Sequence, residues 1–219
     1  MKRLLLALIV LFAVGCQQEP VPEPPVAKES AQPKVEYRTL TALGDSLTEG
    51  LGVEPEMAYP AQLERRLQEA GLKWKVVNAG LAGETSSGAL TRLDWVLKTK
   101  PDAVILVTGA NDGLRGVDPA LTQQNIDAIV SRLKEQDVAV MLGGMKAPPN
   151  LGEDYAGKFE GLYGKVAEKH SIPLIPFFLE GVARDPKLNQ DDGKHPTAEG
   201  YTVVVERIYP QVESWLKGL

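Results

Sequence analysis

The chain has 219 residues, of which 43% are hydrophobic, so it can bury one core of ordinary size but hardly two. Its formal net charge of −5 argues against a general nucleic-acid binder, because such proteins usually carry a basic face. Two histidines and one cysteine leave little for a His/Cys metal site, and they exclude a disulfide within the chain. Chemistry based on hydroxyl, carboxylate and imidazole groups remains open.

The N-terminal segment, residues 1–15, has the form of a signal peptide. Basic residues precede an apolar run at 4–14, which is too short to span a membrane because a span takes roughly 20 apolar residues. The end of this run resembles a bacterial lipobox, which implies that Cys16 is lipidated and becomes the first mature residue. Gln17 after it resembles the pattern of proteins sorted to the outer membrane. The alternative is an ordinary secretory signal with an incidental cysteine.

Residues 16–36 form the second predicted segment, the lipidated cysteine followed by a Pro-rich tether. The composition lacks periodicity, and such a segment cannot bury enough apolar surface to fold. Its prolines favour an extended chain with a reach on the order of 50 Å, at about 3.1 Å per residue. We therefore expect a folded domain of residues 37–219, held by a lipid anchor in the bacterial cell envelope, on the outer membrane and facing the periplasm.

Strand-like apolar runs alternate with helical patterns from residue 37 onward, which is typical of an α/β fold with a parallel sheet. Strands are predicted at residues 39–43, 76–78, 102–108, 138–142 and 172–175. Helices are predicted at 59–70, 86–97 and 155–169, from 119 onward, and from about 197 onward. We expect a three-layer α/β/α architecture around a five-stranded parallel sheet, and we find no internal repeat.

The helix predicted from residue 119 has the clearest start signal. Asp118 is suited to cap it, and Pro119 fits the first helical position, where no N–H is needed. Its buried face is predicted to consist of Leu121, Ile126, Ile129, Val130 and Leu133.

Polar, Gly-rich segments follow three of the predicted strands. Ser46 comes after the first strand, residues 80–85 come after the second, and Asn111 comes after the third. Because ligand sites in open α/β sheets form at the carboxyl ends of strands, these segments are expected on one edge. Taken singly, each could also be a plain turn, since turns favour Gly, Asn and Asp.

A serine hydroxyl needs an adjacent base to act as a nucleophile, usually a histidine oriented by a carboxylate. Ser46 stands in a Gly-led turn, and the distant segment Asp-Asp-Gly-Lys-His-Pro at residues 191–196 could supply both partners. His195 would be the base. Asp191 and Asp192 are both close enough in sequence to orient it.

Four blocks of the sequence together resemble the SGNH (GDSL) hydrolase family. In order, they are Gly44-Asp45-Ser46-Leu47, Gly83, Gly109-Ala110-Asn111-Asp112 and Asp192-Gly193-Lys194-His195-Pro196. The resemblance extends from about Leu40 to the C-terminus, and it is nearest to the bacterial arylesterases, thioesterases and lysophospholipases. It implies a flavodoxin-like fold. Ala110 departs from the pattern, because many members have a second glycine there.

The resemblance implies a role for each matching residue. Ser46 would be the nucleophile and His195 the base, and the family pattern Asp-x-x-His selects Asp192 as the carboxylate. The oxyanion hole would consist of the Ser46 N–H, the Gly83 N–H and the Asn111 side chain. The substrate would be a small acyl or aryl ester, and the mechanism implies no cofactor or metal. Leu114, Phe177 and Phe178 weakly favour an acyl or aryl pocket.

Several alternatives remain beside this interpretation. His170, the other histidine, ends a predicted helix, where a capping role is the simpler reading. Asp45 is interpreted as a turn or capping residue. Thr48 breaks the G-x-S-x-G pattern of the α/β-hydrolase elbow. The chain could also be a carbohydrate deacetylase of the same family, or a lipid-binding envelope lipoprotein without activity. A monomer that binds no nucleic acid is expected.

Overall fold

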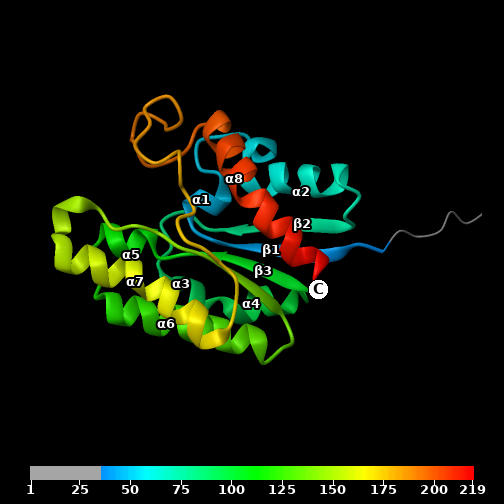
Figure 1. Ribbon diagram of the computed structural model, residues 1–219, viewed down its shortest axis with the longest axis horizontal. Helices are drawn as coiled ribbons and strands as arrows, with labels where there is room; N and C mark the ends of the chain where they lie inside the picture. Colours follow the sequence, from blue (N-terminus) through cyan, green and yellow to red (C-terminus); the bar gives the residue numbers. More distant parts are fainter. Residues whose placement is uncertain (1–35) are drawn as a thin grey trace, which may run out of the picture. The chain divides into compact units, whose positions relative to one another are not determined.

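A parallel sheet forms the centre of the computed structural model, which describes residues 36–219. The predicted signal peptide, Cys16 and all of the predicted tether except residue 36 lie outside the described residues. The strands are β1 (Arg38–Gly44), β2 (Trp74–Gly80), β3 (Ala103–Val107), β4 (Ala139–Gly143) and β5 (Leu174–Ile175). Their order is β2-β1-β3-β4-β5, and every neighbouring pair is parallel (Figure 1). The predicted five-stranded parallel sheet is confirmed, and its order is the flavodoxin-like one.

Helices cover both faces of this sheet, as the predicted three-layer architecture requires (Figure 1). One face carries α2 (Tyr59–Glu69) and α8 (Ala198–Lys217), and the other carries α3 (Ser86–Thr91), α4 (Leu93–Lys98), α6 (Pro119–Lys134) and α7 (Glu153–His170). Two short helices, α1 (Ser46–Glu49) and α5 (Ala110–Leu114), follow β1 and β3 directly. Single 3-10 turns occur at η1 (Pro55–Met57) and η2 (Pro149–Leu151).

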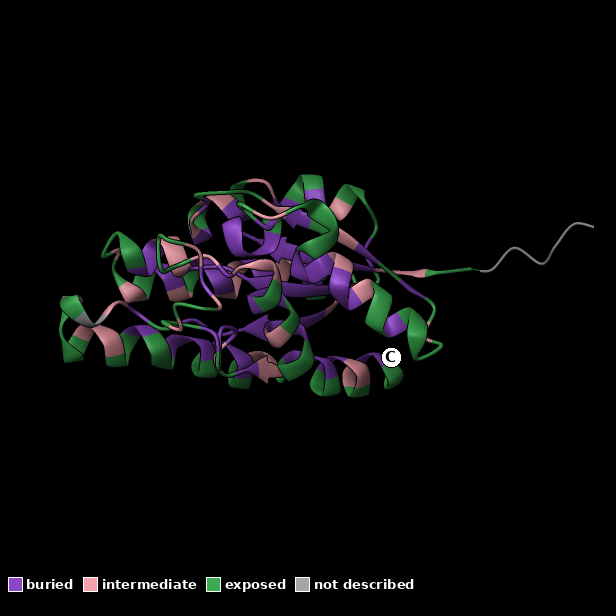
Figure 2. Cartoon of the chain, turned by 90° about the horizontal axis from the view of Figure 1, so that it is seen from above, coloured by how far each residue is buried: buried purple, intermediate pink, exposed green. Residues whose placement is uncertain are grey.

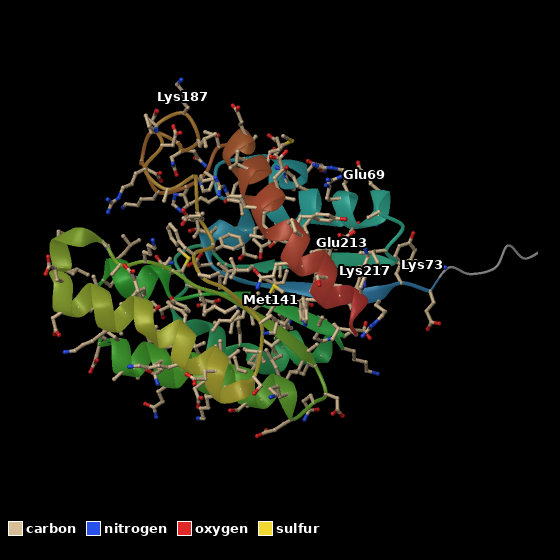
Figure 3. All side chains as sticks on the ribbon, in the orientation of Figure 1. Glu69, Lys73, Met141, Lys187, Glu213 and Lys217 are labelled. Atoms are coloured by element: carbon tan, nitrogen blue, oxygen red, sulfur yellow. The ribbon has the colours of Figure 1, made fainter. Side chains whose placement is uncertain are left out.

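The hydrophobic core lies between the sheet and the two helical layers. All five residues of the central strand β3 are buried, as its continuous apolar sequence predicts for a strand covered on both faces. Figure 2 shows burial concentrated on the sheet and on the helix faces that meet it, while the outer helix faces are exposed. Met141 of β4 is in this interior, whereas Glu69 and Lys187 lie on the outside (Figure 3).

The strand register brings the carboxyl ends of neighbouring strands to one level. Gly44, at the end of β1, pairs with Gly80 of β2 on one side and with Val107 of β3 on the other. Val107 in turn pairs with Gly143 of β4. The segments that leave these strands therefore start side by side, which confirms that the polar segments share one edge.

Three elements near this edge differ from the predictions. The helix predicted at 86–97 is two helices, α3 and α4, which meet at Arg92. The short helices α1 and α5 occupy segments that were predicted as turns. Both are too short for a periodic apolar pattern to reveal them.

The predicted buried face of α6 is correct except at Leu121, which is 48% exposed. Thr122 and Asn125 are buried instead. Their side chains bond to a buried polar group: Thr122 Oγ1 donates to Asp112, and Asn125 Nδ2 donates to Ser86 Oγ. The first two turns of α6 therefore direct polar side chains inward, and Leu121 faces solvent.

The last strand is shorter than the predicted 172–175. The Ile172 N–H closes the end of α7 by donating to Ala167 O at 3.0 Å, and Pro173 has no N–H to donate. The Pro173 carbonyl still accepts from Leu142 N of β4 at 2.9 Å, but only Leu174 and Ile175 pair with β4 as strand residues.

Candidate active site

Ser46 is the first residue of α1, immediately beyond the end of β1. Asp45 caps this helix, because its Oδ1 accepts a hydrogen bond from Leu47 N at 3.0 Å. Only glycine fits at position 44 without a steric clash, since a Cβ there would stand 2.2 Å from Val107 O and 2.3 Å from Thr48 Oγ1. The tight turn from strand to helix fixes the serine at the sheet edge, and the capping role interpreted for Asp45 is confirmed.

Two segments from opposite ends of the domain meet at this serine. Ser46 Oγ lies 2.8 Å from Nε2 of His195, although 149 residues separate the two. On the other side of the imidazole ring, Nδ1 lies 2.5 Å from Oδ2 of Asp192. Asp192 is thus the carboxylate that reaches His195, although both it and the neighbouring Asp191 are exposed.

Hydrogen bonding keeps the Asp192 carboxylate ionised. Burial acts to raise its pKa, but hydrogen bonds from the His195 side chain and from the backbone N–H groups of His195 and Lys194 outweigh it and lower the pKa to about 2. Oδ1 accepts from Lys194 N at 2.9 Å and from His195 N at 3.0 Å. Because an ionised carboxylate can only accept, Nδ1 must donate to it, and in the neutral imidazole Nε2 is then left to accept from the serine hydroxyl.

Gly83 and Asn111 both line the same cleft as Ser46. Gly83 follows β2 with a φ of +75°, a conformation that favours glycine, and its carbonyl accepts from Arg115 Nη2 at 2.9 Å. Asn111 lies in the first turn of α5. Its Nδ2 donates to Glu84 O at 3.0 Å and to Asp45 Oδ2 at 3.4 Å. Both amide hydrogens therefore have acceptors in the chain, and the bond to Asp45 is the longer one.

Asp45 is a buried carboxyl group beside this amide, at 1% exposure. Burial is the largest influence on it and raises its pKa to about 6, against the opposing effects of the Leu47 N–H, the charge of His195 and the Asn111 side chain. The charge of Glu84 raises it further. Sequence reasoning identified the cap but missed this position between the nucleophile turn and Asn111, because turn chemistry alone accounts for an aspartate there.

An ion pair between the half-buried Arg92 and the buried Glu84 supports the loop that contains Gly83. Arg92 Nε donates to Glu84 Oε1 at 2.6 Å, and Nη2 donates to Glu84 Oε2 at 2.7 Å. The same Nη2 reaches Ala79 O at 2.7 Å and Gly44 O at 3.2 Å. Arg92 thus ties the ends of β1 and β2 to the Gly83 loop. No sequence signal singled it out, because an arginine in a helical pattern usually marks a solvated face.

A second buried polar group anchors α5. Asp112 accepts from Ser86 N at 2.8 Å and from Ser86 Oγ at 2.5 Å, and it also accepts from Thr122. Asp112 is 1% exposed, so these bonds replace the water that its carboxylate would otherwise need. They fix the start of α5 and therefore the position of Asn111.

The cleft beside Ser46 and His195 has a volume of about 820 Å³. Its larger apolar lining residues are Leu47, Leu51, Leu114, Met145, Phe177 and Leu179, and its charged ones include Lys146, Glu160, Arg184 and Lys194. Two of the three residues predicted to form an apolar pocket, Leu114 and Phe177, are in this lining. Phe178 is not: it is buried in the core, where its ring packs edge-on against Tyr59 at 5.0 Å.

His170 is not at the site. It is the last residue of α7, and the chain goes from there to the start of β5. His170 therefore lies toward the edge of the sheet where the strands begin, opposite the edge that holds Ser46. Its Nε2 lies 2.8 Å from Oδ1 of Asp127 in α6, and its carbonyl accepts from Lys134 Nζ at 2.6 Å. His170 joins two helices, in agreement with a structural role at the helix end.

Comparison with known proteins identifies the family. The model of the GDSL-like lipase/acylhydrolase family matches residues 42–203. The esterase TesA of Pseudomonas aeruginosa is 38% identical over 180 residues, which cover 82% of this chain and 90% of that protein. Thioesterase 1/protease 1/lysophospholipase L1 of Escherichia coli K12 is 36% identical over 176 residues, covering 80% and 83%.

The solved structures agree with these sequence relatives. The esterase AlinE4, described as a member of the SGNH-hydrolase family, superposes with a TM-score of 0.70 at 41% identity, covering 83% of this chain and 98% of that one. The chain belongs to the GDSL-like lipase/acylhydrolase family, which is the SGNH family that the sequence resembles. Its class is that of the ester hydrolases.

Proposed function

We propose that this chain is a serine esterase for acyl or aryl esters, with Ser46 as the nucleophile, His195 as the general base and Asp192 as the carboxylate that orients it. The observation that carries the proposal is the continuous hydrogen-bonded series from Ser46 Oγ to His195 Nε2 at 2.8 Å and from His195 Nδ1 to Asp192 Oδ2 at 2.5 Å. This order of hydroxyl, imidazole and carboxylate is what nucleophilic acyl transfer requires.

The reaction would proceed in two halves. Ser46 Oγ bonds to the ester carbonyl carbon while its proton passes to His195 Nε2, and the tetrahedral intermediate collapses when the leaving oxygen or sulfur takes that proton. Water then attacks the acyl-serine, gives its proton to His195 and releases the carboxylic acid, while the proton returns to Ser46. Asp192 stabilises the imidazolium that forms in each half.

The negative oxygen of the tetrahedral intermediate needs fixed donors. We assign these to the N–H groups of Ser46 and Gly83 and to the amide of Asn111, which all belong to the cleft. The long bond of 3.4 Å from Asn111 to Asp45 is the one that the oxyanion would replace, since the bond to Glu84 O is shorter.

The apolar lining of the cleft supports an acyl or aryl group as the part of the substrate that is bound. The relatives named above are an esterase and a thioesterase/lysophospholipase, and an arylesterase of Vibrio mimicus is 37% identical over 76% of the chain. The proposed mechanism needs no metal or organic cofactor.

The test is hydrolysis of p-nitrophenyl esters of increasing acyl length by the domain from residue 36 onward, beside its Ser46→Ala variant. We expect turnover to fall by a factor on the order of 10⁴ or more in this variant. Ser214→Ala, which removes an exposed hydroxyl on α8, is the matched control and should keep full turnover. If the unchanged protein is inactive on every ester, acetylated sugars come next, and activity on them alone would favour a deacetylase.

We also propose that the chain is a lipoprotein of the bacterial envelope with three parts: signal peptide 1–15, the lipidated Cys16 with a tether to residue 36, and the hydrolase domain 37–219. The bacterial sources of the relatives support the setting, and the described residues from 36 onward contain no helix with both the length and the apolar character to cross a membrane. We expect labelled palmitate to be incorporated by the full chain and lost in Cys16→Ser. Equal labelling of both would contradict the anchor.

We also propose that the domain is a monomer, and sedimentation of the domain should give the mass of a single chain.

A further inference from the structure

The contact between Ser46 and His195 depends on a loop that projects from the folded layers. The segment between β5 and α8 extends beyond the helices, with Lys187 on its outer part (Figure 3). Within this loop the chain is bonded mainly to itself: Gln190 N donates to His195 O at 2.8 Å, and Gly193 N donates to Gln190 O at 2.8 Å. These bonds shape the turn that presents Asp192 and His195, but they do not locate it relative to Ser46.

The Gln190 side chain links this turn to the nucleophile. Its Nε2 donates to Leu51 O at 2.7 Å and to Pro196 O at 2.9 Å. One amide group therefore bridges the His195 turn and the segment after α1, although Gln190 and Leu51 are 139 residues apart in the sequence. Leu51 N in turn donates to the carbonyl of Ser46 at 3.1 Å. A path of three hydrogen bonds therefore runs from the Ser46 backbone, through Leu51 and Gln190, to the residue that follows His195.

The residue beside Leu51 is shaped to admit this side chain. Gly52 has a φ of +83°, and a Cβ on it would stand 2.1 Å from Gln190 Oε1. A side chain at position 52 would therefore displace the Gln190 amide, and the positive φ itself disfavours residues other than glycine. The chain thus keeps open the space next to the nucleophile helix that Gln190 fills.

The chemistry of the amide suits this position. Two carbonyl oxygens converge on one nitrogen, and a primary amide is a neutral group that offers two N–H donors. A carboxylate would repel both carbonyls, and an apolar side chain would leave them without this donor. We propose that Gln190 is a positioning residue for the reaction: it holds the Asp192–His195 turn at the distance at which His195 Nε2 can take the Ser46 proton. This inference rests on the proposed serine mechanism.

The test compares Gln190→Met with Gln62→Met. Methionine has nearly the same length and lacks the donors, so it removes the bridge with little change in volume. Gln62 is the matched control. Its Nε2 also joins two backbone carbonyls that are far apart from each other in the sequence, Met57 O at 2.6 Å and Ala198 O at 3.3 Å, but it holds α2 against α8. Each variant is measured for thermal stability, for kcat and KM on a p-nitrophenyl ester, and for its rate of inactivation by a fluorophosphonate.

A positioning role predicts a fall in kcat of about 10- to 10²-fold in Gln190→Met, with KM changed by less than about threefold. The inactivation rate should fall in parallel, because a fluorophosphonate reports on the reactivity of the serine independently of ester turnover. Gln62→Met should lose thermal stability but keep both rates. If Gln190→Met does not fold, Gln190→Asn retains the amide on a side chain too short to reach both carbonyls, and the same fall in kcat is expected.

Two results would overturn the inference. One is a folded Gln190→Met or Gln190→Asn protein with kcat and inactivation rate within about twofold of the unchanged protein. The other is an equal loss of both rates in Gln62→Met, which would reduce the effect to general destabilisation. The Ser46→Ala variant is run in the same assays. If it retains turnover, the serine mechanism itself fails, and that failure is distinct from failure of the role assigned to Gln190.

Discussion

Asp45 and Asp192 have pKa values displaced in opposite directions, although both carboxyl groups lie within the candidate site. Burial raises the pKa of Asp45 to about 6 from 3.8, so between about pH 4 and pH 6 the folded chain keeps a proton that the unfolded chain releases. The folded state therefore loses stability as pH rises through this window. The hydrogen bonds that lower the pKa of Asp192 to about 2 act in the other sense, and their contribution is lost only at lower pH.

The first prediction concerns this window. Asp45→Asn keeps an oxygen that can cap α1 and removes the buried charge, so the variant should gain stability relative to the unchanged protein as pH rises from about 4 to about 7. A gain on the order of 3 kcal/mol is the upper bound for a pKa displaced this far. Urea unfolding of both proteins at the two pH values measures it, with exposed Asp191→Asn as the control. A difference independent of pH would show that Asp45 does not titrate there.

The second prediction concerns Asn111. If its amide binds the oxyanion, Asn111→Ala should lower kcat by about 10² to 10³ and leave KM nearly unchanged, since the bond would form only in the transition state. Steady-state kinetics on a p-nitrophenyl ester measure both constants. A loss of less than about threefold would remove Asn111 from the proposed oxyanion hole.

At the residue scale, the sequence was sufficient to find the groups that meet but not their surroundings. Ser46, Asp192 and His195 could be selected because acyl transfer restricts the residue types and the family pattern restricts the spacing. Gln190 and the two acceptors of Asn111 could not, because glutamine and backbone carbonyls occur everywhere and only the folded geometry brings them together.

At the scale of elements, the ends of β1 and β2 are fastened by a single side chain. Arg92 Nη2 bonds to Ala79 O and Gly44 O, and its guanidinium faces Glu84, whose side chain is 4% exposed. Removing the arginine would leave a buried carboxylate without its partner, which is more costly than removing both charges.

The third prediction follows from this pair. Arg92→Met should destabilise the fold by about 3 kcal/mol or more, and adding Glu84→Gln should recover part of the loss. Urea unfolding of both single variants and the double variant gives the coupling between the two side chains. If Arg92→Met and the double variant lose the same free energy of unfolding, the Glu84 carboxylate does not depend on Arg92 as its partner.

The long elements were predictable and the short ones were not. Periodicity and start signals in the sequence predict helices such as α2 and α6, and a continuous apolar run predicts β3. The helix α1 spans Ser46–Glu49, so its conformation is set by the cap and the strand before it rather than by a pattern of its own. The exposure of Leu121 accompanies the buried polar bonds of Thr122 and Asn125, which an apolar pattern does not encode, and the same pattern gives no sign of the break at Arg92.

At the scale of the whole domain, the site joins the first strand to the loop before the last helix. Ser46 and His195 are 149 residues apart, so the site can exist only when the sheet between them has formed. The parallel register aligns Gly44, Gly80 and Val107 at one level, which places the three polar segments that follow them together. This explains why four short blocks, each ambiguous alone, predict one candidate site when they occur in order.

The measurement that tests the central claim most directly is the site of phosphonylation by a fluorophosphonate, found by peptide mass spectrometry in three proteins. The unchanged domain should carry a single adduct on Ser46 Oγ, formed as fluoride leaves. His170→Ala should react at the same rate, because His170 is bonded to Asp127 away from the site, whereas His195→Ala should react slower by a factor on the order of 10² or more. An adduct on another residue, or equal reaction of the two histidine variants, would contradict the proposed Ser46–His195–Asp192 mechanism.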